Sequence, residues 1–313
     1  MRYVIKKVCI FILTLLVISI LVFVAFQIIP GDPTTRMLGT QATPEKVAAL
    51  REQLGLNDSG IARYFIWLSN FVKGDFGTSY SYNLPVRELI SGKLSITAAL
   101  AGMSFLIVLV LSFPIGILRA RFAHSIPDRI AMVFNQLIMS IPPFFIGIIF
   151  TYVFGLMLKL FIPGEFINHS ENSAGFWAYL VFPALAIALP KSAMVVKLLR
   201  SSMIREMSED YVRTAYSRGN SRWQVLRSHV MRNAIIPVVT FLAVTLVDII
   251  AGSIIIEQVF AIPGIGRLLL SSIIGRDLPV VQTIVMIIAF TVITINYAAD
   301  ISYKYIDPRI RFR

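Results

Sequence analysis

The chain is poor in cysteine and histidine, and this shortage removes several classes of function. Cys9 is the single cysteine among 313 residues, so an internal disulfide and any cysteine-based metal or redox site are excluded. His124, His169 and His229 fall in three separate segments outside the apolar runs. No Walker-type phosphate loop, no HExxH motif and no plausible set of nucleophile, base and acid is present. We therefore expect no catalytic residue, no metal and no cofactor; if ATP drives this protein, another chain binds the ATP.

Charged residues are also scarce, at 15% of the chain, whereas hydrophobic residues make up 57%. A soluble domain is usually about half apolar and about a quarter charged, so this composition indicates a protein of the lipid bilayer. A spanning helix needs roughly 20 apolar residues in succession. The sequence therefore predicts an all-α integral membrane protein with six transmembrane helices. The six runs are residues 8–29, 97–118, 130–161, 176–199, 237–256 and 280–301.

Two of these runs allow another interpretation. The third contains the pair Pro142-Pro143, so it forms either two short helices or one kinked span. We favour the kinked span, because neighbouring helices can satisfy backbone groups that proline leaves free. The first run follows three basic residues, as in a signal peptide, but it is too long and no small-residue cleavage site follows it. We expect it to remain as an anchor, with Cys9 buried at its inner end.

Lysine and arginine are distributed unevenly between the two sides that six spans define. With the amino terminus inside, 19 of the 29 basic residues lie in cytoplasmic segments. Seven of the other ten lie in residues 30–96, a segment long enough to be largely exempt from the positive-inside rule. Both termini are therefore expected in the cytoplasm. The net charge of +12 is explained by anionic lipid and partner contacts along this side, and not by nucleic acid.

Two segments outside the spans have local helical signals. In residues 30–96, Thr43 and Pro44 are typical of a helix start and Gly55 of a helix end, and two more helices are expected over residues 61–73 and 85–91. In the cytoplasmic segment at about residues 201–236, a short helix is expected to end at Gly219 in a left-handed or close-approach conformation. Such a compact projection, joined to two spans, can transmit a partner's motion. An amphipathic helix lying on the membrane surface is the alternative.

Asp248 lies near the middle of the fifth run, where an ionisable group costs roughly 2.5–3.5 kcal/mol on insertion scales. It either lines a transport pathway, where it can meet a cationic group, or bonds to a neighbouring helix through Asn135, Gln136 or Asn296. We favour the helix contact. Lys191 lies close enough to a span end for its side chain to extend toward the interface, so we assign it no transport role.

The strongest motif is the segment EQVFAIPGIGRLLLSSIIGRDLPVVQ, residues 257–282. Its marked positions are Glu257, Phe260, Pro263, Gly264, Gly266, Arg276, Asp277, Pro279 and Gln282. On these residues the segment resembles the extracytoplasmic connector between the last two spans in permease subunits of ABC importers, in the oligopeptide, dipeptide and nickel group. A solvated loop is the alternative, but the rest of the chain resembles the same family. The outer runs at residues 30–33, 54–56, 74–79 and 85–86 also look like this group.

The cytoplasmic segment carries a second resemblance. From residue 210 the chain reads DYVRTAYSRGNSRWQ, which is similar to the loop by which such permeases contact their nucleotide-binding subunits. The general pattern is Glu-Ala-Ala, three variable residues and Gly. Here the triplet is Arg-Thr-Ala, a departure at two positions that is associated with the peptide group. The residues that the resemblance assigns to ATPase coupling are Asp210, Tyr211, Arg213, Thr214, Ala215 and Gly219.

The resemblance covers essentially the whole chain and implies a type I ABC importer permease fold in the cell (plasma or inner) membrane. It implies an anchor in residues 1–29, an extracytoplasmic helical segment in residues 30–96, and a permease core in residues 97–313. It also implies a second homologous permease, two ATPase subunits and an extracytoplasmic substrate-binding protein as partners, besides membrane lipid. The outer helices either cover the mouth of the pathway or help to dock that binding protein.

The expected cargo is a short peptide, because no histidine lies within a span to form a station for bare nickel. Import of nickel or of a metal–chelator complex by the same architecture is the alternative. Two other classes stay open, namely an ion-coupled secondary transporter and a receptor without transport function. The first would be expected to show carboxylate relays at the midplane, and Asp248 alone is a poor relay.

Overall fold

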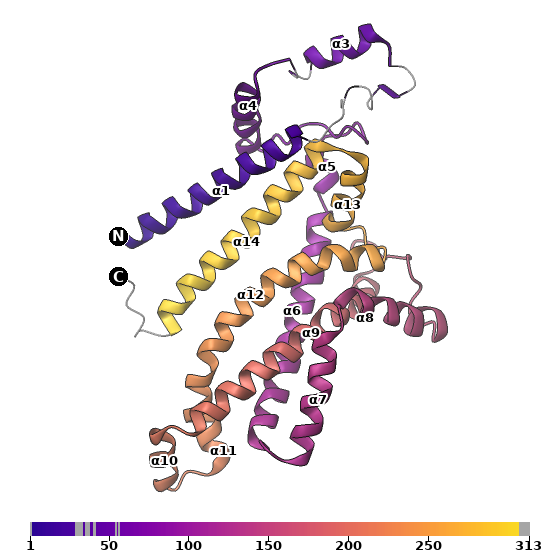
Figure 1. Ribbon diagram of the computed structural model, residues 1–313. Helices are drawn as coiled ribbons and strands as arrows, with labels where there is room; N and C mark the ends of the chain where they lie inside the picture. The colour runs from indigo at the N-terminus through magenta and orange to yellow at the C-terminus, as the bar shows by residue number, and fades with distance from the viewer. Residues whose placement is uncertain are drawn as a thin grey trace. The chain divides into compact units, whose positions relative to one another are not determined.

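The protein is helical in the computed structural model, which describes residues 2–28, 34, 38–39, 42–53, 55 and 57–306 (Figure 1). Within these ranges no β-strand occurs, and an isolated bridge joins Thr78 to Pro85. The predicted motif at residues 30–33 lies outside the described residues, as do residues 54 and 56 of the next motif. The five longest helices are α1 (Arg2–Ile28), α6 (Lys93–Arg121), α9 (Ser173–Met207), α12 (Met231–Val259) and α14 (Leu278–Ile306).

These five helices are long and apolar enough to cross a membrane, and a bent pair of helices brings the number to six if the pair is one span. The pair consists of α7 (Ile126–Ser140) and α8 (Pro143–Phe150), the latter continued by the π-helical turn η2 (Thr151–Met157). The two arms meet at 94°, so two short helices describe this region better than the kinked span that we favoured. A residue before proline avoids the helical conformation. Two such residues in succession, Ile141 and Pro142, are extended here and turn the chain.

The chain divides into two compact units. One consists of Met1–Ser95 with Arg267–Thr294, and the other of Ile96–Gly266 with Ile295–Arg313. The first thus combines the amino-terminal span and the outer segment with part of the carboxyl-terminal region. The second contains α7, α8, α9, α12 and the segment between α9 and α12.

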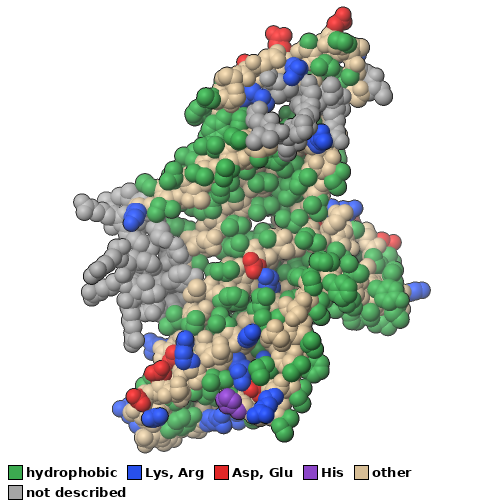
Figure 2. Space-filling view, viewed as in Figure 1, with side chains coloured by type: hydrophobic (Ala, Val, Ile, Leu, Met, Phe, Trp, Pro, Cys, Tyr) green, Lys and Arg blue, Asp and Glu red, His purple; other side chains and the backbone are tan. Residues whose placement is uncertain are grey.

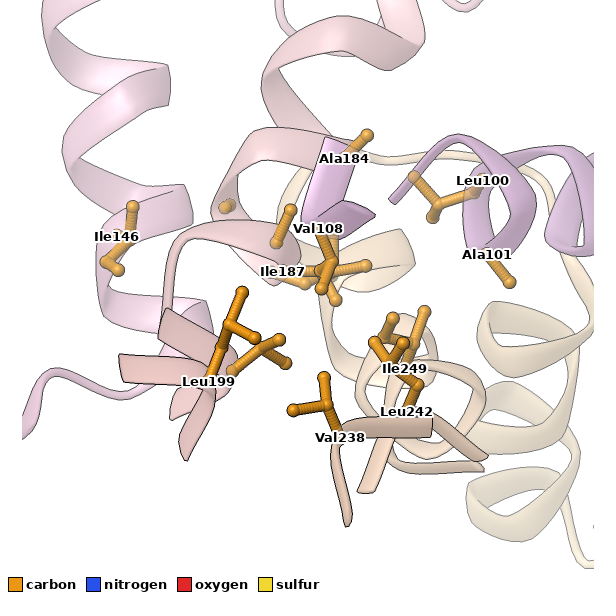
Figure 3. Packing of buried hydrophobic residues seen from close by; sticks show 14 of the residues in the cluster. Leu100, Ala101, Val108, Ile146, Ala184, Ile187, Leu199, Val238, Leu242 and Ile249 are labelled. Atoms are coloured by element: carbon orange, nitrogen blue, oxygen red, sulfur yellow. The ribbon is translucent and has the colours of Figure 1, made fainter. Parts of the chain in front are cut away.

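In the second unit, α9 is the central helix, and 67% of its most apolar window is buried. It packs against α7, α8 and α12. Membrane helices approach closely where their contact residues are small, and a Cβ on Gly116 of α6 would lie 2.8 Å from Leu199 of α9. Figure 3 shows side chains from α6, α8, α9 and α12 converging in this core. They include Val108, Ile146, Ala184, Ile187, Leu199, Val238, Leu242 and Ile249.

In the first unit, α1 packs against α4 (Gly60–Val72), where the hydroxyls of Ser19 and Tyr64 lie 2.8 Å apart. The other helices within residues 30–96 are α3 (Pro44–Gln53) and α5 (Val86–Ile90), so the three predicted helices are present within a few residues of their expected bounds. Most of α1 is uncovered: 17% of its apolar window is buried. Cys9 is accordingly exposed, and the expectation that it is buried was wrong.

Candidate functional site

A buried carboxylate organises the first half of the 257–282 motif. Glu257 lies near the end of α12 and is fully buried. Its Oε1 accepts a hydrogen bond from the Thr97 hydroxyl of α6 at 2.5 Å, and its Oε2 accepts one from the Gly266 amide at 2.8 Å. The Thr97 oxygen in turn accepts a bond from the Ile265 amide at 3.0 Å. Since α13 (Ile265–Gly275) begins here, the acid satisfies the free amides of a helix start and ties it to α6.

The glycines of this half are required by close approach. A Cβ on Gly264 would lie 2.3 Å from the Glu257 carboxyl group, and one on Gly266 would lie 2.4 Å from the backbone of Ile254. Pro263 and Gly264 therefore form the turn that carries the chain back over Glu257. Phe260 is also buried, and its carbonyl accepts a 2.6 Å bond from the Tyr179 hydroxyl of α9. The region from 257 to 266 is thus a packed anchor between helices and not a solvated loop.

A second buried carboxylate organises the other half of the motif, within the first unit. Asp277 is fully buried and accepts hydrogen bonds from the Ser79 hydroxyl, from the Tyr80 amide at 3.0 Å and from the Ser81 amide at 3.1 Å. The structure therefore joins two motifs that the sequence showed separately, the outer run at residues 74–79 and the Arg276-Asp277 pair. Arg276 itself has a φ of +48°, a left-handed turn that aims the next residue inward.

The residues around Asp277 hold the outer run in a tight loop. A Cβ on Gly77 would lie 3.9 Å from Pro279, in the first turn of α14 (Leu278–Ile306). Gln282 follows in the first turns of the same helix and is half-buried. Burial raises the pKa of the Tyr80 phenol; Arg63 opposes this effect and Asp277 adds to it. The loop is therefore closed around a buried acid and a protonated phenol at neutral pH.

The predicted coupling segment forms helix α10 (Asp210–Ser217), followed by α11 (Arg222–Gln224) and the π-helical turn η3 (Val225–Val230). Val212 and Ala215 are buried, and α10 packs against η3. Its polar residues point outward: the side chains of Asp210 and Arg213 are 95% and 80% exposed. Val212 and Ala215 are covered by protein, although Tyr216 is exposed, which argues against the alternative of a helix lying on the membrane with a free apolar face.

Gly219 ends α10 with a φ of +81°, the left-handed conformation that the sequence indicates. Its amide donates to the Tyr216 carbonyl at 2.9 Å. Ser221 then begins α11 with reciprocal bonds to Gln224, so the chain turns sharply between two short helices. On the preceding side, Tyr211 donates to Glu206 of α9 at 2.8 Å. Figure 2 shows basic side chains gathered at this end of the unit, where Figure 1 places α10 and α11.

An ion cluster that the sequence did not reveal joins three helices of the same unit. Asp128 of α7 is buried and pairs with Arg119 of α6 at 3.2 Å. Arg200 of α9 donates to both oxygens of Asp128, at 2.9 Å and 2.5 Å. The backbone amide of His124 also donates to Oδ2 of Asp128, at 3.2 Å. A signal was present, because Ser125 three residues before an aspartate is typical of a helix start, but that signal indicates a cap and not an ion pair.

Asp248 does not contact the residues that we named as its neighbours. Its Oδ2 accepts a 2.6 Å bond from Lys191 of α9. Asn135 instead donates to the Ala193 carbonyl, and Gln136 accepts from Lys197. The expected position of Lys191 near the end of a helix was wrong, because α9 extends to Met207, well beyond the apolar run, and Lys191 lies in the middle of the helix. Among the described residues, no group of three His, Cys, Asp or Glu side chains could hold a metal ion.

The fold and these sites define a membrane-spanning transport subunit. In its second unit, the buried Glu257 fixes the carboxyl-terminal end of α12, and the compact helical projection α10 precedes the start of that helix. The chain belongs to the family of binding-protein-dependent transport system inner membrane components. Residues 112–312 match the model of that family, and residues 1–101 match the model of its N-terminal region. The protein is therefore a multi-pass inner-membrane component that works with other ABC subunits, and separate subunits hydrolyse the ATP.

The chain is similar along its whole length to curated relatives. It is 36% identical over 314 residues to the oligopeptide transport system permease protein AppB of Bacillus subtilis, covering 99% of each chain. It is 31% identical to the probable peptide ABC transporter permease protein y4tP of Sinorhizobium fredii, again over 99% of each. It is 33% identical to the glutathione transport system permease protein GsiC of Salmonella choleraesuis, over 100% of both.

A solved structure supports the fold. One chain of the MetNI methionine ABC transporter, in an inward-facing form, matches with a TM-score of 0.57 at 19% identity. The match covers 70% of this chain and 96% of that one. The type I importer fold that the sequence indicated is thereby confirmed.

Proposed function

We propose that this chain and a second homologous permease form the pathway of an importer for short peptides. The observation that carries the substrate class is the match over almost the whole chain to relatives named for peptides, oligopeptides and glutathione, which is a tripeptide. An extracytoplasmic binding protein delivers the peptide, and two ATPase subunits drive the change between outward-open and inward-open forms. In this proposal residues 1–29 anchor the chain, residues 30–96 meet the binding protein, and residues 97–313 form the permease core.

The substrate class is tested by uptake in cells that lack this gene and then regain it. We expect gene-dependent uptake of labelled peptides of two to five residues, and none of labelled nickel salts. Nickel offered with an organic chelator forms the third arm of the experiment. Gene-dependent uptake of nickel, free or chelated, without uptake of any peptide would overturn the proposed substrate.

We place both termini and α10 on the cytoplasmic side, on the strength of the basic residues gathered there. Single cysteines at Ser59, Ser173 and Ser221, each exposed in the structure, test this orientation in a Cys9→Ala background. Positions 59 and 173 are expected to react in intact cells with a thiol reagent that does not cross membranes, while position 221 reacts only after lysis. Reaction of position 221 in intact cells would invert the orientation.

We assign ATPase coupling to α10 and its closing glycine, through Asp210, Tyr211, Arg213, Thr214, Ala215 and Gly219. The support is geometric: the buried side of α10 rests on η3, which leads directly into α12, while its polar side is open to a partner. A force applied to α10 is therefore passed to two long helices, α9 before it and α12 after it.

Gly219→Val and Ala215→Asp are expected to lower ATP-dependent uptake at least tenfold while the protein stays in the membrane. A left-handed backbone costs an ordinary residue roughly 1–2 kcal/mol and is worse for a β-branched one. Ala215→Asp instead places a charge in a packed contact. Gly219→Asn is the matched control, because asparagine tolerates this conformation and nothing lies within 4 Å of a Cβ there. Near-normal uptake in both damaging variants would remove the coupling role from this segment.

A further inference from the structure

One face of α12 is not used by the core that surrounds the rest of the helix. The buried positions of α12 recur every three or four residues: Val238, Leu242, Thr245, Ile249, Ser253 and Ile256. The exposed positions recur with the same spacing on the other side: Thr240, Val244, Asp248, Ala251, Ile255 and Gln258. Half of the exposed positions are polar, including a carboxylate. A face of this composition is unsuited to lipid tails and fits either water or another protein.

Asp248 sits deep on this face. It lies 11 residues before the end of α12 at Val259 and farther still from its start, so at about 1.5 Å per residue it is roughly 16 Å or more from either end. Its side chain is 50% exposed, whereas that of its partner Lys191 is 16% exposed. An ionised group at such a depth is stable only when it faces protein or water. The exposed half of Asp248 therefore does not face lipid.

The two carboxylate oxygens of Asp248 differ in their hydrogen bonding. Lys191 lies behind the carboxylate with its ammonium on Oδ2 at 2.6 Å. Oδ1 accepts no hydrogen bond from any residue that the structure describes, so it is free to accept one from outside. The accessible group is thus an oxygen acceptor with negative charge, and its natural ligand is an N–H cation.

We propose, building on the proposed function, that Asp248 is a station in the pathway that binds the terminal ammonium group of the passing peptide. Lys191 is its positioning residue: it fixes the carboxylate through the 2.6 Å bond and weakens the attraction of the carboxylate for the solute, because the pair as a whole is neutral. Such a station binds the peptide weakly enough to release it again, and transport through a series of sites requires such release. This station does not recognise the side chains of the peptide, which suits a class of solutes that share their terminal groups and differ in their side chains.

The test uses the purified complex of both permeases and both ATPases in proteoliposomes, with saturating binding protein loaded beforehand with one of two solutes. These are trialanine and propionyl-dialanine, which has nearly the same size and carboxyl end but lacks the ammonium group. Loading before delivery separates the selectivity of the permease from that of the binding protein. We expect Asp248→Asn to lower the rate for trialanine about tenfold and to change the rate for propionyl-dialanine by less than about twofold, since only trialanine offers the ammonium group for a charge-assisted bond.

The charge-swapped double variant, Lys191→Asp with Asp248→Lys, distinguishes a station from a structural ion pair. It keeps the pair between α9 and α12 but presents a cation, so trialanine transport is expected to remain low. Thr240→Val, two turns away on the same face, is the matched control and is expected to alter neither rate. Full recovery of trialanine transport in the swapped variant, or equal loss of both solutes in Asp248→Asn, would overturn the station. Loss of the second permease during purification of Asp248→Asn would also overturn it, by placing Asp248 at the interface between permeases. If the unaltered complex moved neither solute, the proposed function itself would fail.

Discussion

Glu257→Ala is expected to remove most of the folded permease from the membrane. The carboxylate accepts hydrogen bonds from the Thr97 hydroxyl and the Gly266 amide, and its removal leaves both buried donors without this acceptor. An unsatisfied buried donor costs about 1–3 kcal/mol, so the two together approach the margin of stability of many proteins. Glu257→Gln keeps the size and one acceptor oxygen, and we expect an intermediate loss.

Membrane-extracted protein is measured by quantitative blotting, and its thermal midpoint by the decay of the monodisperse peak in size-exclusion chromatography. Gln258→Ala is the matched control, because the neighbouring side chain is exposed. If Glu257→Ala and Gln258→Ala gave the same protein level and the same midpoint, the anchor would have no energetic role.

Asp128→Ala is expected to destabilise the permease by about 3–5 kcal/mol, the usual cost of removing one partner from a buried ion pair. The variant leaves Arg119, 7% exposed, and Arg200, 16% exposed, with uncompensated charge among three helices. Replacing all three residues together, with leucine for Asp128 and methionine for each arginine, is expected to restore much of the loss because no charge is then buried.

The control for this cluster is the ion pair between Asp210 and Arg213, whose side chains are 95% and 80% exposed. Such a pair contributes about 0–1 kcal/mol, so Asp210→Ala should shift the thermal midpoint little. Equal midpoints for Asp128→Ala and Asp210→Ala would contradict the prediction. So would a triple variant that is less stable than Asp128→Ala alone.

The parts of the fold that depend on local backbone chemistry could be predicted from the sequence. Gly55, Gly74 and Gly219 each have a positive φ, and each stands at the end of a helix that its neighbours indicate. The five long apolar helices follow from apolar length, which is also a local property. Hydropathy contains no information about the angle between two helices, however. The 94° bend after Ile141 was therefore not predicted, even though its two prolines were recognised.

The parts that depend on contacts between distant segments could not be predicted. Arg119 and Arg200 lie at the ends of spans, where basic residues are expected for orientation alone. Nothing in a single sequence indicates that both turn inward to the same aspartate. Lys191 was misplaced for a related reason: a helix continues past the end of its apolar run when its later turns pack on protein, as α9 does to Met207.

The two buried acids also limit how early two of the contacts in this fold can form during synthesis of the chain. Glu257 depends on a hydroxyl that is synthesised 160 residues earlier, and Asp277 on one that is synthesised 198 residues earlier. In a growing chain, Thr97 therefore lacks its partner until the end of α12 has been made, and Ser79 lacks its partner until the residue before α14 has been made. Contacts of such sequence separation form late, because their loops must close first. A chain truncated before residue 257 lacks both acids, so neither the Thr97 contact nor the Ser79 contact can form in it.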